Sequence, residues 1–245
     1  MTYCVGLLLD SGLVIASDSR TNAGVDHVAI FPKMTIFERA GERVIVLTTS
    51  GNLAISQAVI NHLQQAIHDN QEPHLLSVST LFEAAQVVGK AIRSVHHNDA
   101  EALRQQHTEF LQSILLGGQI RGEAPRLFNI YAAGNFIEAC QQTPYFQIGE
   151  TKYGKPILDR VLANGTSLDE AVKCTLISFD STIRSNLSVG LPIDLFVYRT
   201  DSFSTIERHH ITETDRYFSQ LRKGWAEGLR KVFSELPAPP WHQGE

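Results

Sequence analysis

The sequence lacks several features that assign a protein to a large functional class. No run of about 18 apolar residues occurs, so we expect no membrane-spanning helix. The first residues lack the basic region of a secretion signal, and Asp10 breaks the early apolar stretch. HExxH, GxSxG and Walker-type motifs are also missing, which removes the motif evidence for a zinc peptidase, a serine esterase or a nucleotide triphosphatase. We expect a cytoplasmic protein with no membrane contact.

Cysteine and positive charge are also scarce. The cysteines Cys4, Cys140 and Cys174 are three in number and widely spaced, which gives no disulfide framework and suits a reducing compartment. We expect them to be buried thiols. The net charge is -5 and the basic residues are scattered, so we expect no nucleic-acid partner.

Histidine is present, but not in a pattern typical of metal sites. The adjacent pairs at 96–97 and 209–210 point their side chains apart on any regular helix or strand. No Cys/His knuckle spacing occurs either. We therefore predict no bound metal and no cofactor.

The 245 residues are enough for one large domain with a substantial core. Hydrophobic residues at 43% and charged residues at 19% are ordinary for a globular protein, and no repeat or low-complexity segment interrupts the chain. We predict a single domain over residues 1–245, with a C-terminal helix at 213–236 and a proline-rich tail at 237–245.

Hydrophobic periodicity divides the chain into strands and helices in alternating groups. Asn52 and Ser167 are placed to cap the helices that follow them, and residues 117–125 read as a turn. The predicted strands are 2–9, 13–19, 34–39, 44–49, 112–116, 126–131, 136–139, 194–198 and 203–211; the predicted helices are 53–70, 81–110, 156–163, 168–185 and 213–236. Two packed antiparallel sheets leave two outer faces that need helices, so this order predicts an α+β, four-layer αββα sandwich.

Thr2 is the most informative residue for function. If Met1 is removed, Thr2 carries a hydroxyl and a free α-amine, which together form a nucleophile and its base. An α-amine titrates near ~8, so part of it is unprotonated at neutral pH and can accept the hydroxyl proton. A small second residue is common in proteins, however, and Thr2 alone does not establish catalysis.

Several separated segments resemble one family of hydrolases. They are DSRTNAG at 18–24, FPK at 31–33, TSG at 49–51, IGETKYGKP at 148–156 and SVGLP at 188–192. Together with Thr2, these segments resemble the N-terminal-nucleophile hydrolases of the proteasome type and, more specifically, the bacterial Anbu family, the "ancestral beta subunits". The resemblance covers essentially the whole chain. It implies a proteasome-subunit-like fold.

The resemblance implies that Thr2 is the nucleophile and that Lys33 and Asp18 assist it. A cation beside the hydroxyl lowers the cost of forming an alkoxide. A buried ammonium needs a carboxylate partner, so Asp18 and Lys33 belong together. Without Thr2, the same two residues read as an ordinary surface ion pair.

Three further residues receive roles from the resemblance. The Gly51 N–H would stabilise the oxyanion of the tetrahedral intermediate, although Gly51 also reads as a turn glycine between a strand and a helix. Ser188 matches a supporting serine of the family. Arg20 and the turn after it would shape a groove where a peptide adds as an extra strand, or Arg20 is a surface residue.

The chain departs from the family pattern at two orienting positions. Glu150 stands where proteasomal subunits have a serine, and Ser185 stands where they have an aspartate. Glu150 either stabilises a protonated terminal amine, which weakens that amine as a base, or points away. Asn186, beside the changed position, is a candidate to supply hydrogen bonds.

The resulting expectation is a threonine-type hydrolase that cleaves peptide or other amide bonds. The alternatives are a ring or scaffold subunit with little or no peptidase activity, and an amidase for a small or isopeptide-like substrate. The resemblance implies self-association into a closed ring or an open helical, lock-washer arrangement. An ATPase or operon partner is an open question at this stage.

Overall fold

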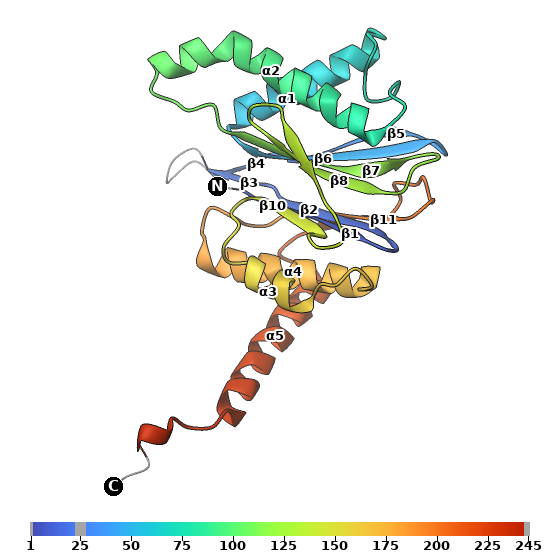
Figure 1. The fold of residues 1–245 in the computed structure, drawn as a ribbon. Helices are drawn as coiled ribbons and strands as arrows, with labels where there is room; N and C mark the ends of the chain where they lie inside the picture. Colours follow the sequence, from blue (N-terminus) through green and yellow to red (C-terminus); the bar gives the residue numbers. More distant parts are fainter. Residues whose placement is uncertain (1, 23–27, 243–245) are drawn as a thin grey trace.

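The computed structural model describes residues 2–22 and 28–242, and two five-stranded antiparallel sheets form its centre (Figure 1). The first sheet has the order β10-β1-β2-β11-β12 and the second has the order β5-β6-β7-β8-β9. The strands of the first sheet are β1 (Tyr3–Leu9), β2 (Gly12–Asp18), β10 (Tyr145–Gly149), β11 (Ile193–Arg199) and β12 (Arg208–Ile211). Those of the second are β5 (Met34–Arg39), β6 (Arg43–Gly51), β7 (Gln112–Ile120), β8 (Arg126–Tyr131) and β9 (Phe136–Glu138). A short ribbon, β3 (Arg20–Asn22) and β4 (Val28–Ile30), stands apart from both.

Helices cover the outer face of each sheet (Figure 1). The second sheet is covered by α1 (Leu53–His68) and α2 (Leu81–Gln105), and the first by α3 (Lys155–Val161) and α4 (Leu168–Ser185). Asn52 caps α1, and Ser167 caps α4 in a capping box with Glu170, as their positions in the sequence predict. The predicted four-layer αββα sandwich is confirmed.

Three apolar clusters hold these layers together. One joins the second sheet to α1 and α2, and another joins the first sheet to α3 and α4. The third lies between the sheets and contains Cys4, Ile15, Val46, Leu115 and Phe196. Alternate side chains of each strand therefore pack into two different cores. Both faces of β1, β2 and β6 are buried, which explains why their sequences are continuous apolar runs.

Two predicted boundaries in the sheets are wrong. Residues 117–120 continue β7 and are not part of a turn. Gly117 and Gly118 leave room there for the packed strands beside them: a Cβ on Gly117 would lie 2.6 Å from Ile15 Cδ1. The strand predicted at 203–211 is reduced to β12, because Phe203 has φ 42° and is turned inward to donate its N–H to the Tyr198 hydroxyl.

Other elements differ from expectation in simpler ways. The structure has strands β3, β4 and β10, which periodicity did not predict, and α2 ends at Gln105, before the expected 110. Cys4 and Cys174 are buried as expected, but Cys140 is exposed, so the prediction for that thiol is wrong. No helix in residues 2–22 and 28–242 combines the length and apolar character needed to cross a membrane.

The C-terminal helix α5 (Arg216–Glu235) contacts the sandwich through its first half and then leads away from it (Figure 1). Phe218 is its one buried residue. Arg222 Nε donates to Asp180 Oδ1 of α4 at 2.7 Å, and Arg184 binds the same buried carboxylate. One aromatic side chain and one buried carboxylate thus fix the direction of α5.

We expect Phe218→Ala to destabilise the fold by about 3–5 kcal/mol, because it removes a fully packed ring from the contact between α5 and α4. The measurement is the free energy of unfolding in urea. Ser219→Ala, at the exposed neighbouring position, is the control and should change it by less than about 0.5 kcal/mol. Equal effects of the two substitutions would contradict this account of how α5 is anchored.

Candidate active site

Thr2 lies just before β1 and is buried, with 8% of the residue exposed. Because β1 lies between β2 and β10, the ends of both neighbouring strands flank Thr2. Asp18 ends β2 on one side; on the other side Gly149 ends β10, and Glu150 follows it. Met1 is outside the described residues.

The Asp18 carboxylate connects Lys33 to the start of β1. Lys33 Nζ lies 2.8 Å from Asp18 Oδ1, and the backbone N–H of Tyr3 donates to the same oxygen at 3.0 Å. Lys33 Nζ also donates to the carbonyl of Arg20 at 2.5 Å. The ammonium is therefore held by the carboxylate that also binds the amide directly after Thr2.

Both charged side chains of this ion pair are out of solvent. The exposed fraction of the side chain is 5% for Lys33 and 0% for Asp18. Burial raises the pKa of the Asp18 carboxyl, and the Lys33 ammonium and the Tyr3 amide oppose that shift. A surface ion pair, the ordinary alternative for these residues, is thereby excluded.

Gly149 brings the backbone of β10 against Thr2 and the second sheet. It has φ 82°, and a Cβ there would lie 2.1 Å from the Thr2 carbonyl oxygen and 2.9 Å from Ser50 Oγ. Sequence reasoning did not assign this role. The dipeptide Gly149-Glu150 inside the matching IGETKYGKP segment was the available signal.

Glu150 is buried on the side of Thr2 away from Asp18. Its backbone N–H donates to the Thr2 carbonyl at 2.6 Å. Its carboxylate accepts hydrogen bonds from the Lys152 N–H and from Asn186 Nδ2, each at 2.9 Å. Asn186 Oδ1 in turn accepts from the backbone N–H of Ser188 at 3.0 Å. The structure thus joins Glu150, Asn186 and Ser188 in one network.

Ser185 is not part of that network. It is the last residue of α4 and is exposed, whereas Asn186, the next residue, is buried and faces Glu150. The buried hydrogen-bonding group at this end of α4 is therefore the amide of Asn186.

Arg20 is half-buried and bound to the same connection between α4 and β11. Its Nη1 donates to the carbonyl of Leu187 at 3.2 Å, and its guanidinium lies against Gly190. The turn predicted to shape a groove after Arg20 falls at residues 23–27, which are outside the described residues.

Gly51 ends β6 in an exposed position with φ 122°. A Cβ there would lie 2.2 Å from the Leu111 carbonyl oxygen, so the close approach of the end of β6 to the start of β7 itself requires glycine. Its neighbour Ser50 reaches Gly149, which places this end of β6 beside Thr2. The backbone requirement and a role in binding substrate are compatible.

The nearby thiol is not a competing nucleophile. Cys4 is fully buried, and burial raises its pKa far above the ordinary thiol range. Its Sγ lies 3.6 Å from the Thr49 carbonyl. Among residues 2–22 and 28–242, no group of three or more His, Cys, Asp or Glu side chains is arranged to hold a metal ion.

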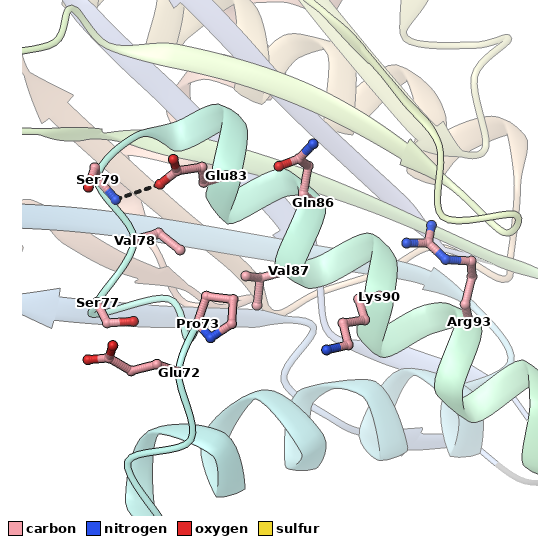
Figure 2. Close-up of a pocket in the computed structure, with 10 residues that line it drawn as sticks. All are labelled: Glu72, Pro73, Ser77, Val78, Ser79, Glu83, Gln86, Val87, Lys90 and Arg93. Atoms are coloured by element: carbon pink, nitrogen blue, oxygen red, sulfur yellow. Dashed lines mark hydrogen bonds between the residues drawn. The ribbon is translucent and has the colours of Figure 1, made fainter.

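A separate hollow of about 630 Å³ lies on α2 and the segment between α1 and α2 (Figure 2). Two of its charged side chains already serve the fold: Glu83 accepts the Ser79 N–H at 2.7 Å, and Arg93 donates to the Gly134 carbonyl at 3.1 Å. Neither Thr2 nor the Asp18–Lys33 pair lines it. The convergent polar groups around Thr2 are therefore the candidate active site.

Known proteins share sequence with most of this chain. Residues 2–197 match the sequence profile of the family described as "Proteasome subunit". The proteasome subunit beta of Methanopyrus kandleri is 26% identical over 189 residues, covering 77% of this chain and 82% of the relative.

Solved structures similar to this chain extend the match to nearly its full length. Anbu (ancestral beta-subunit) from Yersinia bercovieri is 52% identical, with a TM-score of 0.92 and coverage of 97% of this chain and 98% of that chain. The structure titled "Helical Assembly of the Anbu Complex from Pseudomonas aeruginosa" is 50% identical, with a TM-score of 0.94 and coverage of 99% and 100%.

We expect Asp18→Asn to cost about 3–5 kcal/mol of stability, because it leaves the Lys33 ammonium buried without its carboxylate. Adding Lys33→Met to that variant should restore most of the loss, since the unpaired charge is then gone. Urea unfolding at neutral pH measures both effects.

Glu138→Gln is the matched control for this cycle. It removes a carboxylate from the half-exposed pair with Arg126 and should cost at most about 1 kcal/mol. If Asp18→Asn costs no more than Glu138→Gln, the buried pair does not have the energetic role described.

Proposed function

The chain belongs to the proteasome subunit family and, within it, to the Anbu proteins, and we propose that it is a threonine-type N-terminal-nucleophile hydrolase cleaving peptide or other amide bonds. The observation that carries the proposal is the shared carboxylate. Asp18 Oδ1 binds both the Lys33 ammonium and the amide that follows Thr2. A buried cation and the residue after the candidate nucleophile share one carboxylate oxygen, which supports the proposal.

Removal of Met1 starts the proposed mechanism. The Thr2 hydroxyl attacks the substrate carbonyl carbon, and its proton passes to the free α-amine, directly or through water. The Lys33 ammonium lowers the energy of the developing alkoxide, and Asp18 keeps that ammonium charged and in place. The Gly51 N–H donates to the oxyanion of the tetrahedral intermediate.

Collapse of that intermediate breaks the C–N bond. The departing amine takes the proton held by the α-amine, and the acyl group stays on Thr2 as an ester. Water then attacks the ester, gives one proton back to Thr2, and releases a carboxylic acid. Ser188, whose N–H is bound by Asn186, supports the geometry beside Glu150 in this scheme.

A peptide substrate would bind beside Arg20 by adding main-chain hydrogen bonds to an open strand edge. The contact of the Arg20 guanidinium with the Leu187 carbonyl supports a fixed wall at that position. The chemistry fits amide bonds generally, so a small or isopeptide-like substrate is the second form of the same proposal. We place the reaction in the cytoplasm, which the three unpaired cysteines support.

The competing proposal is a scaffold subunit with little or no peptidase activity. Glu150 and Ser185 stand where proteasomal subunits have two groups that orient the terminal amine, and this difference favours the scaffold. Ser185 is exposed, so its side chain adds no orienting contact near Thr2. The two functions differ in whether the mature Thr2 reacts.

Intact-mass analysis of the full chain should show loss of Met1, and a threonine-directed electrophile should then add one equivalent to Thr2. Thr2→Ala should abolish the addition, while Thr2→Ser, which keeps a hydroxyl, should retain it. Lys33→Ala should slow the addition by about 10²–10⁴-fold. A matured, folded chain that does not react would establish the scaffold function instead.

We also propose that the protein self-associates through α5. The Pseudomonas aeruginosa relative is described as a helical assembly, and α5 lies beyond residues 2–197, the part shared with proteasome subunits in general. Past its anchor, the helix exposes an apolar stripe at i, i+3 and i+4 spacing. Its exposed members are Leu229 (52%), Val232 (58%), Phe233 (78%) and Leu236 (62%), the last directly after the helix; Tyr217 (49%), beside the anchor Phe218, is exposed as well. A second copy of the chain is the occupant that this relationship favours; an ATPase docking there is an alternative outcome.

The double variant Leu229→Glu and Phe233→Glu should convert the assembly to smaller species in sedimentation velocity, because two charges then replace the centre of the stripe. Glu227→Lys, on the opposite side of α5, is the control and should leave the sedimentation coefficient unchanged. An unchanged assembly in the double variant would exclude α5 as the contact.

A further inference from the structure

Glu150 is a buried carboxylate directly beside the second residue of the chain. Tyr3 pairs with Gly149 in the antiparallel ladder of β1 and β10, so Thr2 and Glu150 lie opposite each other where these strands end. The hydrogen bond from the Glu150 N–H to the Thr2 carbonyl, 2.6 Å long, fixes that arrangement. Only 7% of Glu150 is exposed.

The donors that hold this carboxylate are neutral. One is the backbone N–H of Lys152, and the other is the side-chain amide of Asn186. Among residues 2–22 and 28–242, no lysine, arginine or histidine side chain forms an ion pair with Glu150. Burial of a carboxylate without a cation is unfavourable, so a cation placed beside Glu150 would be stabilised there.

Removal of Met1 creates a cation at the neighbouring position. An α-amine has an ordinary pKa near ~8, so most of it is an ammonium at pH 7. We propose that Glu150 is the counter-ion of the mature N-terminus: its carboxylate binds the Thr2 ammonium and sets the direction in which the amine points. This inference rests on the proposed function only for the removal of Met1. Glu150 is then a positioning residue, since it acts through the amine.

Asn186 keeps the carboxylate in the position that this role requires. Its Nδ2 donates to Glu150 Oε2, while its Oδ1 accepts the Ser188 N–H, so the amide cannot turn without losing both bonds. The connection between α4 and β11 therefore holds the Glu150 carboxylate through Asn186. A carboxylate fixed in this way gives a directional contact to an ammonium.

The other charges at this end of the sheet compensate each other. Asp18 and Lys33 lie on the β2 side of Thr2 and form a pair with no net charge. Lys152 contributes its backbone N–H, and its side chain is exposed. Within residues 2–22 and 28–242, Glu150 is thus a carboxylate beside the amine that forms no ion pair with a basic side chain, and it favours the protonated amine. Turnover by the free amine should consequently increase toward alkaline pH.

The test measures the amine directly and needs no peptidase turnover. The chain is released from a carrier by a protease that leaves Thr2 as the first residue, so every variant has the amine. Competitive acetylation over a neutral to alkaline pH series, followed by mass spectrometry of the N-terminal peptide, gives its pKa. We expect the pKa in the native wild-type chain to exceed that in the urea-unfolded chain, and Glu150→Gln to lower the native value by about one unit.

Glu109→Gln removes an exposed carboxylate and is the matched control, with no change in the pKa of the amine expected. The comparison of the amine pKa in native and unfolded wild-type protein needs no variant. It therefore tests the proposal even if Glu150→Gln does not fold. A native pKa no higher than the unfolded one, or equal to that of folded Glu150→Gln, would overturn the proposal. A raised pKa in a chain whose Thr2 is unreactive would overturn the hydrolase function alone.

Discussion

The shared oxygen of Asp18 is the interaction on which the site depends. It accepts the Tyr3 N–H from β1 and the Lys33 ammonium from the segment before β5. Lys33 is fixed a second time, because its carbonyl accepts the Thr49 N–H of β6 at 3.0 Å. One carboxylate therefore ties the start of the first sheet to an edge of the second. Since the pair is buried, the position of Lys33 relative to Thr2 is set by packing of the two sheets and not by a flexible side chain.

The backbone around Thr2 is constrained as strongly as the charges. Gly149 brings β10 against the Thr2 carbonyl and Ser50, and Gly51 ends β6 where any side chain would collide with residue 111. Both glycines have positive φ, so each is required by chain geometry before any role with substrate is considered. A site made from the ends of β1, β2, β6 and β10 has little freedom to move apart.

Local pattern predicted much of this fold, and tertiary contacts explain the rest. Short segments carry the signals for several elements: the β1–β2 hairpin, the apolar stripes of α1 and α2, and the caps at Asn52 and Ser167. The strand β10 is too short to show a clear pattern, and glycines 117 and 118 serve as strand residues only because other strands pack against them.

In the site, the residue types at positions 2, 18 and 33 indicated the chemistry. The bond from Asn186 to Glu150 joins residues 36 apart and has no local signal.

The two carboxylates beside Thr2 have opposite consequences for the amine. Asp18 is neutralised by Lys33, so it contributes geometry with little net field, whereas the donors to Glu150 among the described residues are neutral, which leaves its charge to act on the proposed ammonium. An ammonium held by Glu150 would order the N-terminus in a scaffold as well as in an enzyme, so ordering alone does not distinguish those functions. What distinguishes them is the Asp18–Lys33 pair: burying a cation is costly, and a scaffold gains nothing from a buried cation held by the carboxylate that binds the amide after Thr2. The buried Asp18–Lys33 pair therefore agrees with the proposed hydrolase, and Glu150 predicts that the amine of such an enzyme is a weaker base than a free α-amine.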